Sequence, residues 1–437
     1  MAAETSDEPR DDWWRLYQDA RLDQFLDEAF SANTDLAAAT ANLAAASALL
    51  TAARAGRYPA TAVATGGIYG RDAATDEILE LGGHPPQTLW IFDDLLEVSY
   101  EIDLFGRVRR TVEATRAGTE AAAAARDSLR VVVAAETIRA YADVCALGAQ
   151  IDVAQRSLRI VSREADIAES RHEAGANSEF DVVRAQGLVA QIRATLPPLE
   201  GQRRAALFQL AAVLGRTPAN APLDVGECVT VPHLAALMPV GDGAQLLKRR
   251  PDVRQAERAL AAATARIGVA TADLYPTIGF RGLYGGVATQ VSELGTAQGL
   301  AWGIGPSVTW SFPNQSIPRA RIKQAEAAAA AALATFDSTV LRALKEAEQA
   351  LAIYAAELRG RDALAQAQER AHRAFEMARD ELLAGAVSSL DLLTAEQTVV
   401  TADAAVAASD TAMIRDEISV FKALGGGWQS AASGNPH

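Results

Sequence analysis

The feature that most constrains this 437-residue chain is an internal repeat. The segment Ala174–Asp181 matches Ala384–Asp391 at an offset of 210 residues. Nearer the start of each copy the offset is 217, where Tyr58-Pro59 aligns with Tyr275-Pro276. A self-match over such a length predicts two copies of one large unit, with a loop that is longer in the first copy.

Each predicted copy has the same order of elements: a helix, two strands, a very long helix, a glycine-containing turn and a return helix. The long helices are expected because they contain no proline and are rich in alanine, the best helix former. The predicted bounds are an N-terminal extended segment 1–21; a first repeat 22–215 with helix 22–56, strands 60–71 and 94–105, long helix 107–173 and return helix 178–214; a linker or equatorial region 216–245; a second repeat 246–427 with helix 250–273, strands 276–286 and 300–312, long helix 319–383 and return helix 388–424; and a flexible C-terminal tail 428–437.

A few residues depart from this regular pattern. Pro197-Pro198 should kink or split the first return helix, because proline lacks the amide hydrogen that a helix uses. Gly148 and Gly360 are candidates for bends in the long helices. The two cysteines, Cys145 and Cys228, are most simply small buried residues, and the sequence leaves open whether they pair.

The predicted strands alternate with period two. From Leu300 to Phe312 every even position is large and apolar or proline, whereas the odd positions are small or polar. The segment Leu96–Leu104 alternates in the same way, so each strand has one apolar face. The predicted lipid-facing residues are Tyr100, Ile102, Trp302, Ile304, Val308 and Trp310, and the opposite, lumen face carries Glu97, Glu101 and Asp103.

Length and composition favour a bilayer over a soluble sheet as the setting of these strands. They exceed the usual five or six residues, four of them occur in a chain otherwise helical, and tryptophan and tyrosine cluster at them as in interfacial belts. Four strands cannot close a barrel, and lipid does not tolerate an open edge. Three copies would supply twelve strands, although two or four copies also fit the arithmetic. The alternative is a soluble helical coiled-coil scaffold with a small capping sheet.

Composition excludes several classes of function. The formal net charge of −14 and the pI near 5.0 disfavour nucleic-acid binding, which needs a basic face. Two cysteines and five scattered histidines give no metal-ligand spacing. Nucleophile–base pairs and phosphate loops are not apparent either, so we expect no enzyme and no cofactor. We also expect no spanning helix, because no run of about 18 apolar residues is evident.

The long helices also carry a heptad seam. In the first copy it runs through Val144, Leu147, Ile151, Ala154, Leu158, Val161, Ala165 and Ala168, and in the second through Leu364, Ala367, Ala371, Ala374 and Ala378. Gaps of three and four predict coiled-coil packing. A helix of about 65 residues extends roughly 100 Å, which suits a device that crosses an aqueous compartment. An ordinary antiparallel bundle is the alternative.

Four short motifs follow one another along the chain: Trp13-Trp14 with Asn33–Leu36, Tyr100–Arg107, Arg249–Val253 and Ala272–Pro276. In this order they resemble the outer membrane factor (TolC-like) family, most closely its OprM/NodT branch, over about residues 12–427. The resemblance implies a mainly α chain with a transmembrane β-barrel contribution. Three subunits would form one twelve-stranded outer-membrane barrel, continued through the periplasm by a coiled-coil α-helical barrel.

The resemblance also implies a function and partners. The chain would be the exit duct of a tripartite efflux system, docked to a periplasmic adaptor (membrane fusion) protein and an inner-membrane transporter of the resistance-nodulation-division type. Drugs or other small molecules are the expected cargo, with metal export or protein secretion as alternatives. Members of this branch usually begin, after processing, with a lipid-bearing cysteine. We expect a signal peptide and this cysteine to precede the present sequence, and the alternative is a member that is not a lipoprotein.

By this resemblance the two glycine turns lie at the periplasmic mouth. Asp181 and Asp391 would ring the mouth as a gate, where crowded carboxylates attract cations. Each also fits a capping box, which leaves helix capping alone as the alternative. Thr394 stands where the family often has a second Asp, which weakens a gate of paired aspartates. The predicted adaptor-contact residues are Arg171, Gly175, Asn177, Ser178, Glu381, Gly385, Val387 and Ser388, with a solvated turn as the alternative.

Two arginines mark the points where a predicted strand passes into a long helix. Arg107 and Arg319 are expected at the lipid–water boundary, or else in a local salt bridge with Asp103 or a neighbour.

Overall fold

The computed structural model describes residues 4–5, 12–71, 77, 80–83, 85, 88–176, 178–232, 234, 238–239 and 243–425. The chain divides into two compact units that are interleaved in sequence. One unit takes residues 1–41, 123–255 and 337–437, and the other takes 42–122 and 256–336. Each unit therefore contains segments of both sequence repeats. The predicted tail 428–437 lies outside the described residues.

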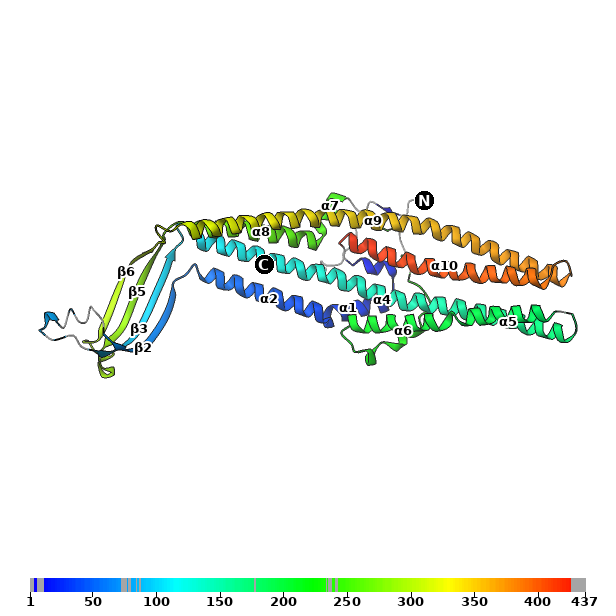
Figure 1. The fold of residues 1–437 in the computed structure, drawn as a ribbon, viewed down its shortest axis with the longest axis horizontal. Coiled ribbons are helices and arrows are strands. Elements are labelled where there is room, and N and C mark those ends of the chain that lie inside the picture. Colours follow the sequence, from blue (N-terminus) through cyan, green and yellow to red (C-terminus); the bar gives the residue numbers. More distant parts are fainter. Residues whose placement is uncertain are drawn as a thin grey trace. The chain divides into compact units, whose positions relative to one another are not determined.

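Two helices of unusual length run through the chain, α4 (Arg107–Glu173) and α9 (Ser316–Leu383) (Figure 1). After each comes a glycine turn and a return segment. The second return segment is the single helix α10 (Ser389–Ala423). The first is split into α5 (Glu179–Arg193) and α6 (Leu196–Val213), with Pro197-Pro198 in the first turn of α6. Proline is accommodated there because the first amide groups of a helix have no intrahelical acceptor.

The N-terminal region differs from the predicted extended segment. Residues Trp13–Tyr17 form a 3-10 helix that buries Trp13 and Tyr17. The predicted helix 22–56 is divided into α1 (Ala20–Ala32) and α2 (Thr34–Ala55). Asn33 causes the break: its side chain donates to the Val213 carbonyl at 3.0 Å and accepts from the Leu36 amide at 3.0 Å. Both bonds favour a junction over a continuous helix.

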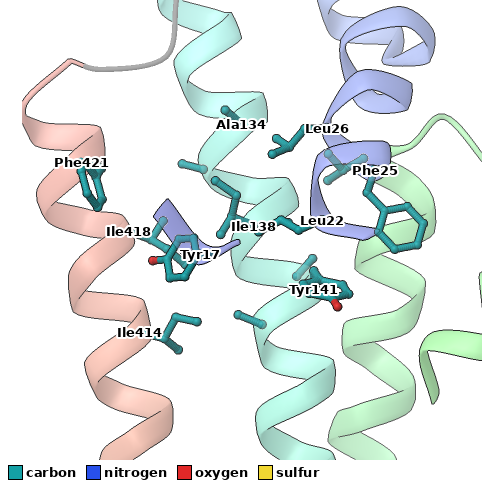
Figure 2. Close-up of a cluster of buried hydrophobic side chains, with 14 of the residues drawn as sticks. Tyr17, Leu22, Phe25, Leu26, Ala134, Ile138, Tyr141, Ile414, Ile418 and Phe421 are labelled. Carbon is teal, nitrogen blue, oxygen red and sulfur yellow. The ribbon is translucent and has the colours of Figure 1, made fainter. Parts of the chain in front are cut away.

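The core of the first unit gathers around this N-terminal region (Figure 2). Apolar side chains of α1, α4, α6 and α10 are buried there. The rings of Trp13 and Phe421 stack with centroids 4.3 Å apart, which joins the start of the chain to its last helix. At the first turn of α1, the Asp19 carboxylate accepts from the amides of Arg21 and Leu22 and from the Tyr141 hydroxyl at 2.7 Å.

The described residues of the predicted linker region contain regular elements and a covalent attachment to α4. It contains 3-10 turns at Pro218–Asn220 and Leu223–Glu227, a short strand β4 (Met238–Pro239) that pairs with β1 (Glu4–Thr5), and α7 (Gly243–Arg249). A disulfide joins Cys145 of α4 to Cys228. The pairing that the sequence left open is thus present, and it closes a loop with a sequence separation of 83 residues.

Gly148 lies directly against the segment that carries Cys228. A Cβ atom at this position would fall on the carbonyl oxygen of Cys228, far inside van der Waals contact, and 2.7 Å from Nη2 of Arg203. The Arg203 guanidinium itself donates to the Cys228 carbonyl at 2.8 Å. Glycine is required here because the disulfide-bearing segment lies directly against the α4 backbone. At Gly360, by contrast, a Cβ atom would meet nothing within 4 Å.

Arg250 ties α8 (Pro251–Ala272) to two other helices. Its side chain is 8% exposed and donates to both carboxylate oxygens of Asp252, at 3.0 and 2.7 Å. It also donates to Glu346 of α9 at 2.8 Å and to the Ala423 carbonyl at the end of α10 at 2.9 Å. A buried guanidinium is tolerated here because its N–H groups donate to two carboxylates and a backbone carbonyl.

The second unit contains the four-stranded antiparallel sheet, in the order β2-β3-β5-β6 (Figure 1). The strands are β2 (Ala60–Gly70), β3 (Leu89–Ile102), β5 (Thr277–Ala288) and β6 (Leu300–Thr309), and a 3-10 turn (Val291–Glu293) follows β5. Strand β3 begins before the predicted residue 94, and β6 ends before Trp310. Strands β2 and β6 are the two edges of the sheet.

Two helices correct the expectation that no helix could span a membrane. Helix α2 and part of α9 are long and apolar enough by length and composition, with mean hydropathies of 1.5 and 1.3 over 18 residues. Only 6% and 11% of these windows are buried. Their apolar character comes mainly from alanine, which contributes little surface per residue, so the finding is weak evidence for spanning helices.

Candidate functional site

One face of the sheet is apolar over four consecutive rows, which end at Asp94 of β3. The register aligns Leu96, Tyr284 and Trp302 across three strands. The rows that follow on the same face are Val98, Gly282 and Ile304; Tyr100, Phe280 and Pro306; and Ile102, Ile278 and Val308. Trp302, Ile304 and Val308 are 71%, 80% and 65% exposed. So large an exposed apolar surface on one sheet face marks contact with lipid or another apolar partner.

The predicted lipid-facing residues mostly share this face. Tyr100, Ile102, Trp302, Ile304 and Val308 lie on it, whereas Trp310 falls beyond the end of β6. The Trp310 indole donates to the Leu274 carbonyl at 3.2 Å, and its ring stacks on Phe312. At the opposite end of the sheet Trp90 packs against Tyr69 and Phe92. Aromatic groups thus flank both ends of the strands, as in membrane-spanning sheets.

The opposite face of the sheet carries charged, polar and small residues together with Leu95 and Leu283. Glu97 and Glu101 of β3 lie on it, and Arg281 of β5 is opposite Ser99 between them. Glu101 forms an ion pair with Arg107, with one hydrogen bond of 2.9 Å from Nε. Sequence analysis did not single out Arg281, although its alternation with Ile278 and Phe280 was the available signal. This face therefore presents both signs of charge.

Asp103 has a different position from the other two predicted lumen carboxylates. It lies beyond β3, and its oxygens accept from the amides of Val108 and Arg109, both at 2.8 Å. Asp103 therefore caps the start of α4. The salt bridge considered for Arg107 exists, but with Glu101 and not with Asp103.

The two glycine turns have the same hydrogen-bond pattern. Gly175 and Gly385 have φ angles of +75° and +74°, the left-handed region in which glycine is favoured. The amide of Gly175 donates to the His172 carbonyl and that of Ala176 to the Arg171 carbonyl. In the second repeat the amides of Gly385 and Ala386 donate to the carbonyls of Leu382 and Glu381. Both turns are therefore Schellman motifs that end the long helices.

Both return helices begin with a capping box. Ser178 accepts from the Asp181 amide and the Asp181 carboxylate accepts from Ser178, and Ser388 and Asp391 repeat the arrangement. Hydrogen bonds from the Ser388 hydroxyl and amide lower the pKa of Asp391. Its carboxylate is therefore charged throughout the neutral range. Thr394 donates to the Leu390 carbonyl at 2.8 Å and does not replace a second carboxylate.

The ends of the two helical hairpins share one cavity. Arg171 and Asp181 from the first repeat line it together with Leu382 and Leu390 from the second. Glu381 and Ser388 are exposed and Val387 is half-buried, whereas Asn177 lies outside the described residues. The apolar side chains beside these turns were not among the predicted site residues, and two of them, Phe180 and Leu383, are 68% and 76% exposed. Their place next to a capping serine and a terminal glycine was the signal available.

Comparison with known proteins matches nearly the whole chain. The family described as "Outer membrane efflux protein" matches residues 25–216 and 243–426. Nodulation protein T of Rhizobium leguminosarum bv. viciae is 29% identical over 425 residues, 97% of this chain and 86% of that protein. The pyoverdine export outer membrane protein OpmQ of Pseudomonas aeruginosa is 28% identical over 436 residues, 97% of this chain and 88% of that protein.

Solved structures agree with these matches. The outer-membrane channel OprN has a TM-score of 0.91 and 32% sequence identity to this chain, and the match covers 98% of this chain and 95% of that one. Four strands, two long helices and two helical returns are thus a known arrangement.

Proposed function

The chain belongs to the outer membrane efflux protein family, and from this premise we propose that three copies form the exit duct of a tripartite efflux system. It is an outer-membrane channel with a large periplasmic portion. In the proposed assembly the sheets of three subunits form one barrel of twelve strands. The long helices continue the passage through the periplasm, and an adaptor connects it to an inner-membrane pump.

The two-faced sheet with unpaired edges is the observation that carries this proposal. An apolar face that includes Trp302, Ile304 and Val308 suits acyl chains, and the opposite face, with its charged, polar and small residues, suits water. Edge strands β2 and β6 leave backbone donors and acceptors unpaired, which is costly in hydrocarbon. Pairing β6 of one subunit with β2 of the next satisfies these groups and closes a ring.

Strand length supports the same interpretation. The four strands have 11, 14, 12 and 10 residues. A tilted transmembrane strand needs about 9–11 residues, so each is long enough to cross the hydrocarbon core. A soluble scaffold with a capping sheet would leave the apolar face without a partner, and this alternative is less favourable.

The residues of the duct have proposed roles of three kinds. Glu97 and Glu101, with Arg281, would line the barrel lumen. Asp181 and Asp391 would place six carboxylates at the periplasmic mouth, in addition to capping their helices. The turns around Gly175 and Gly385, with Arg171, Asn177, Ser178, Glu381, Val387 and Ser388, would contact the adaptor.

The proposed cargo and partners follow from the family and its relatives. We favour small molecules driven by a resistance-nodulation-division pump, and the related OpmQ is described as a pyoverdine export outer membrane protein. Metal ions or secreted proteins are the alternatives. In the proposed system the choice of cargo would reside mostly in the pump, because a passive duct supplies no energy.

Conductance and drug sensitivity test the proposal together. We expect the purified protein to behave as a trimer in detergent by multi-angle light scattering and to conduct ions in planar bilayers. We expect cells that lack the protein to be more sensitive to drugs. A monomer that remains dispersed without detergent and does not conduct would refute it.

A further inference from the structure

Helix α10 carries a carboxylate within its apolar seam. Glu396 is 2% exposed, and among the described residues neither of its carboxylate oxygens has a hydrogen-bond partner. It lies one turn after Leu392 and one turn before Val399, which are both buried. Spacings of four and three residues put Glu396 on the face of α10 that packs against its neighbours.

Four helices contribute to the cavity that Glu396 lines. Its charged lining residues are Glu164 and Arg171 from α4 and Asp181 and Arg184 from α5; α9 contributes Leu382, and the remaining lining is apolar, with Ile167, Ala168, Ala185, Leu390, Leu392 and Leu393. Next to it Val161, Leu188 and Ile192 form a small buried apolar cluster with Leu393 and Val400. Glu396 thus lies where the two helical hairpins meet, close to the glycine turns.

An ionised carboxylate is unfavourable in such a place. Burying a charge without a partner costs far more than burying a neutral acid, so the group holds its proton instead. Burial, and then the charge of Glu164, raise the pKa of Glu396 to about 7. The side chain therefore changes charge close to neutral pH, whereas Asp391 at the turn stays ionised there.

We propose that Glu396 is a proton-dependent latch between the two helical hairpins near the mouth. When protonated, it allows α10 to pack against α4 and α5. When ionised, it faces Glu164 without a cation in contact, and the contact between the helices loosens until water reaches the carboxylate. The latch itself concerns packing within one subunit, and its consequence for the opening of the mouth rests on the proposed channel function.

The sign of the effect follows from proton linkage. The packed state holds the proton more tightly than a solvated Glu, whose ordinary value is 4.5. Packing is thus most stable in acid and weakens as pH rises from about 4.5 to about 7, beyond which it changes no further. Over that window the opening constant should rise by about fivefold to sevenfold per pH unit.

Hydrogen exchange measures the latch directly. In the purified protein, the exchange rates of the amides of residues 390–400 are compared with those of E396Q at the same pH, so that the intrinsic pH dependence cancels. We expect the ratio of the wild-type rate to the E396Q rate to rise by about fivefold to sevenfold per pH unit between pH 5 and 7 and to level off above pH 7. A ratio that does not vary with pH would overturn the proposal.

Two further variants keep the test decisive if E396Q folds poorly. E164Q retains Glu396 but removes the facing charge, so the wild-type transition should move to lower pH. E169Q changes an exposed Glu on the same helix and should leave the transition in place. An unmoved transition in E164Q, or an equal shift in E169Q, would contradict a latch formed by this pair.

Bilayer recordings separate the latch from the channel function. We expect the open probability of the wild type to increase from pH 5 to 7 and that of E396Q to remain constant. Normal conductance with pH-independent exchange would refute the latch and leave the channel intact. A pH-dependent exchange ratio in a protein that never conducts would support the latch and refute the channel.

Discussion

The Tyr17 hydroxyl donates a hydrogen bond of 3.2 Å to Oε2 of Glu417, which joins the 3-10 helix Trp13–Tyr17 to α10 across 400 residues. Both groups are buried, with exposures of 6% and 4%. Burial raises the pKa of Glu417 to about 7, and the hydrogen bond from Tyr17 only partly offsets this. The Tyr17 ring contacts Trp13, which stacks on Phe421. The hydrogen bond and the stacked rings together attach the 3-10 helix to α10.

The first prediction concerns E417Q and pH. Because the native state holds a proton that the unfolded chain loses, stability should fall as pH rises from about 4.5 to about 7, by at most about 3 kcal/mol for Glu417. The melting temperatures of E396Q and E396Q/E417Q are compared between pH 5 and 8. Both variants lack the Glu396 carboxyl, so any difference in the pH dependence of their melting temperatures comes from Glu417. The melting temperature should fall less steeply with pH in the double variant. Equal pH dependence in the two variants would contradict a buried, protonated Glu417.

A second prediction compares two helical glycines. Gly148→Ala forces a Cβ atom onto the Cys228 carbonyl and the Arg203 guanidinium, and should destabilise the protein by about 1–3 kcal/mol. Gly360→Ala meets open space in α9 and should stabilise it by up to about 1 kcal/mol. Denaturant titration of both variants measures the difference. Equal effects would show that the disulfide segment does not lie against α4.

A third prediction distinguishes the two faces of β6. Ile304→Arg places a charge on the 80% exposed apolar face and should cost about 2–4 kcal/mol at the centre of a bilayer. Ser307→Arg places the same charge on the opposite face and should insert normally. Heat-modifiable gel mobility after reconstitution into liposomes reports insertion. Equal tolerance of both substitutions would argue against lipid contact.

A fourth prediction tests the Arg250 junction. Arg250→Ala removes a buried cation from Asp252, Glu346 and the Ala423 carbonyl, and should cost about 3 kcal/mol because these acceptors lose their donor. Arg258→Ala removes the more exposed pairs with Glu120 and Glu257 and should cost less than about 1 kcal/mol. Comparable losses in urea titrations would mean that Arg250 contributes no more than a surface pair.

Periodic patterns made much of this fold predictable. The alternation in Leu300–Phe312 identified the apolar face of β6, because side chains on a strand change face at every residue. Its end at Thr309 was less visible, because Trp310 continues the pattern although its indole binds the Leu274 carbonyl instead. The break at Asn33 was missed because it depends on the Val213 carbonyl, which is distant in sequence.

The candidate sites were predictable only where the chemistry is local. The capping boxes of Asp181 and Asp391 involve residues three apart, so the sequence is enough to find them. That Asp103 caps the start of α4 can be recognised only once β3 is known to end at Ile102. Glu396 was overlooked although it interrupts an apolar seam, because its significance depends on Glu164 from another helix.

Strands β2 and β6, the two unpaired edges of each sheet, have a genetic consequence in the proposed trimer. Each subunit would pair its edge strands with those of two neighbours. One copy with a defective edge strand would therefore leave the barrel open even when the other two copies are normal. If defective and normal chains are made in equal amounts and mix freely, only about one assembly in eight contains normal chains alone. Alleles that damage an edge but preserve the remaining fold should therefore be dominant.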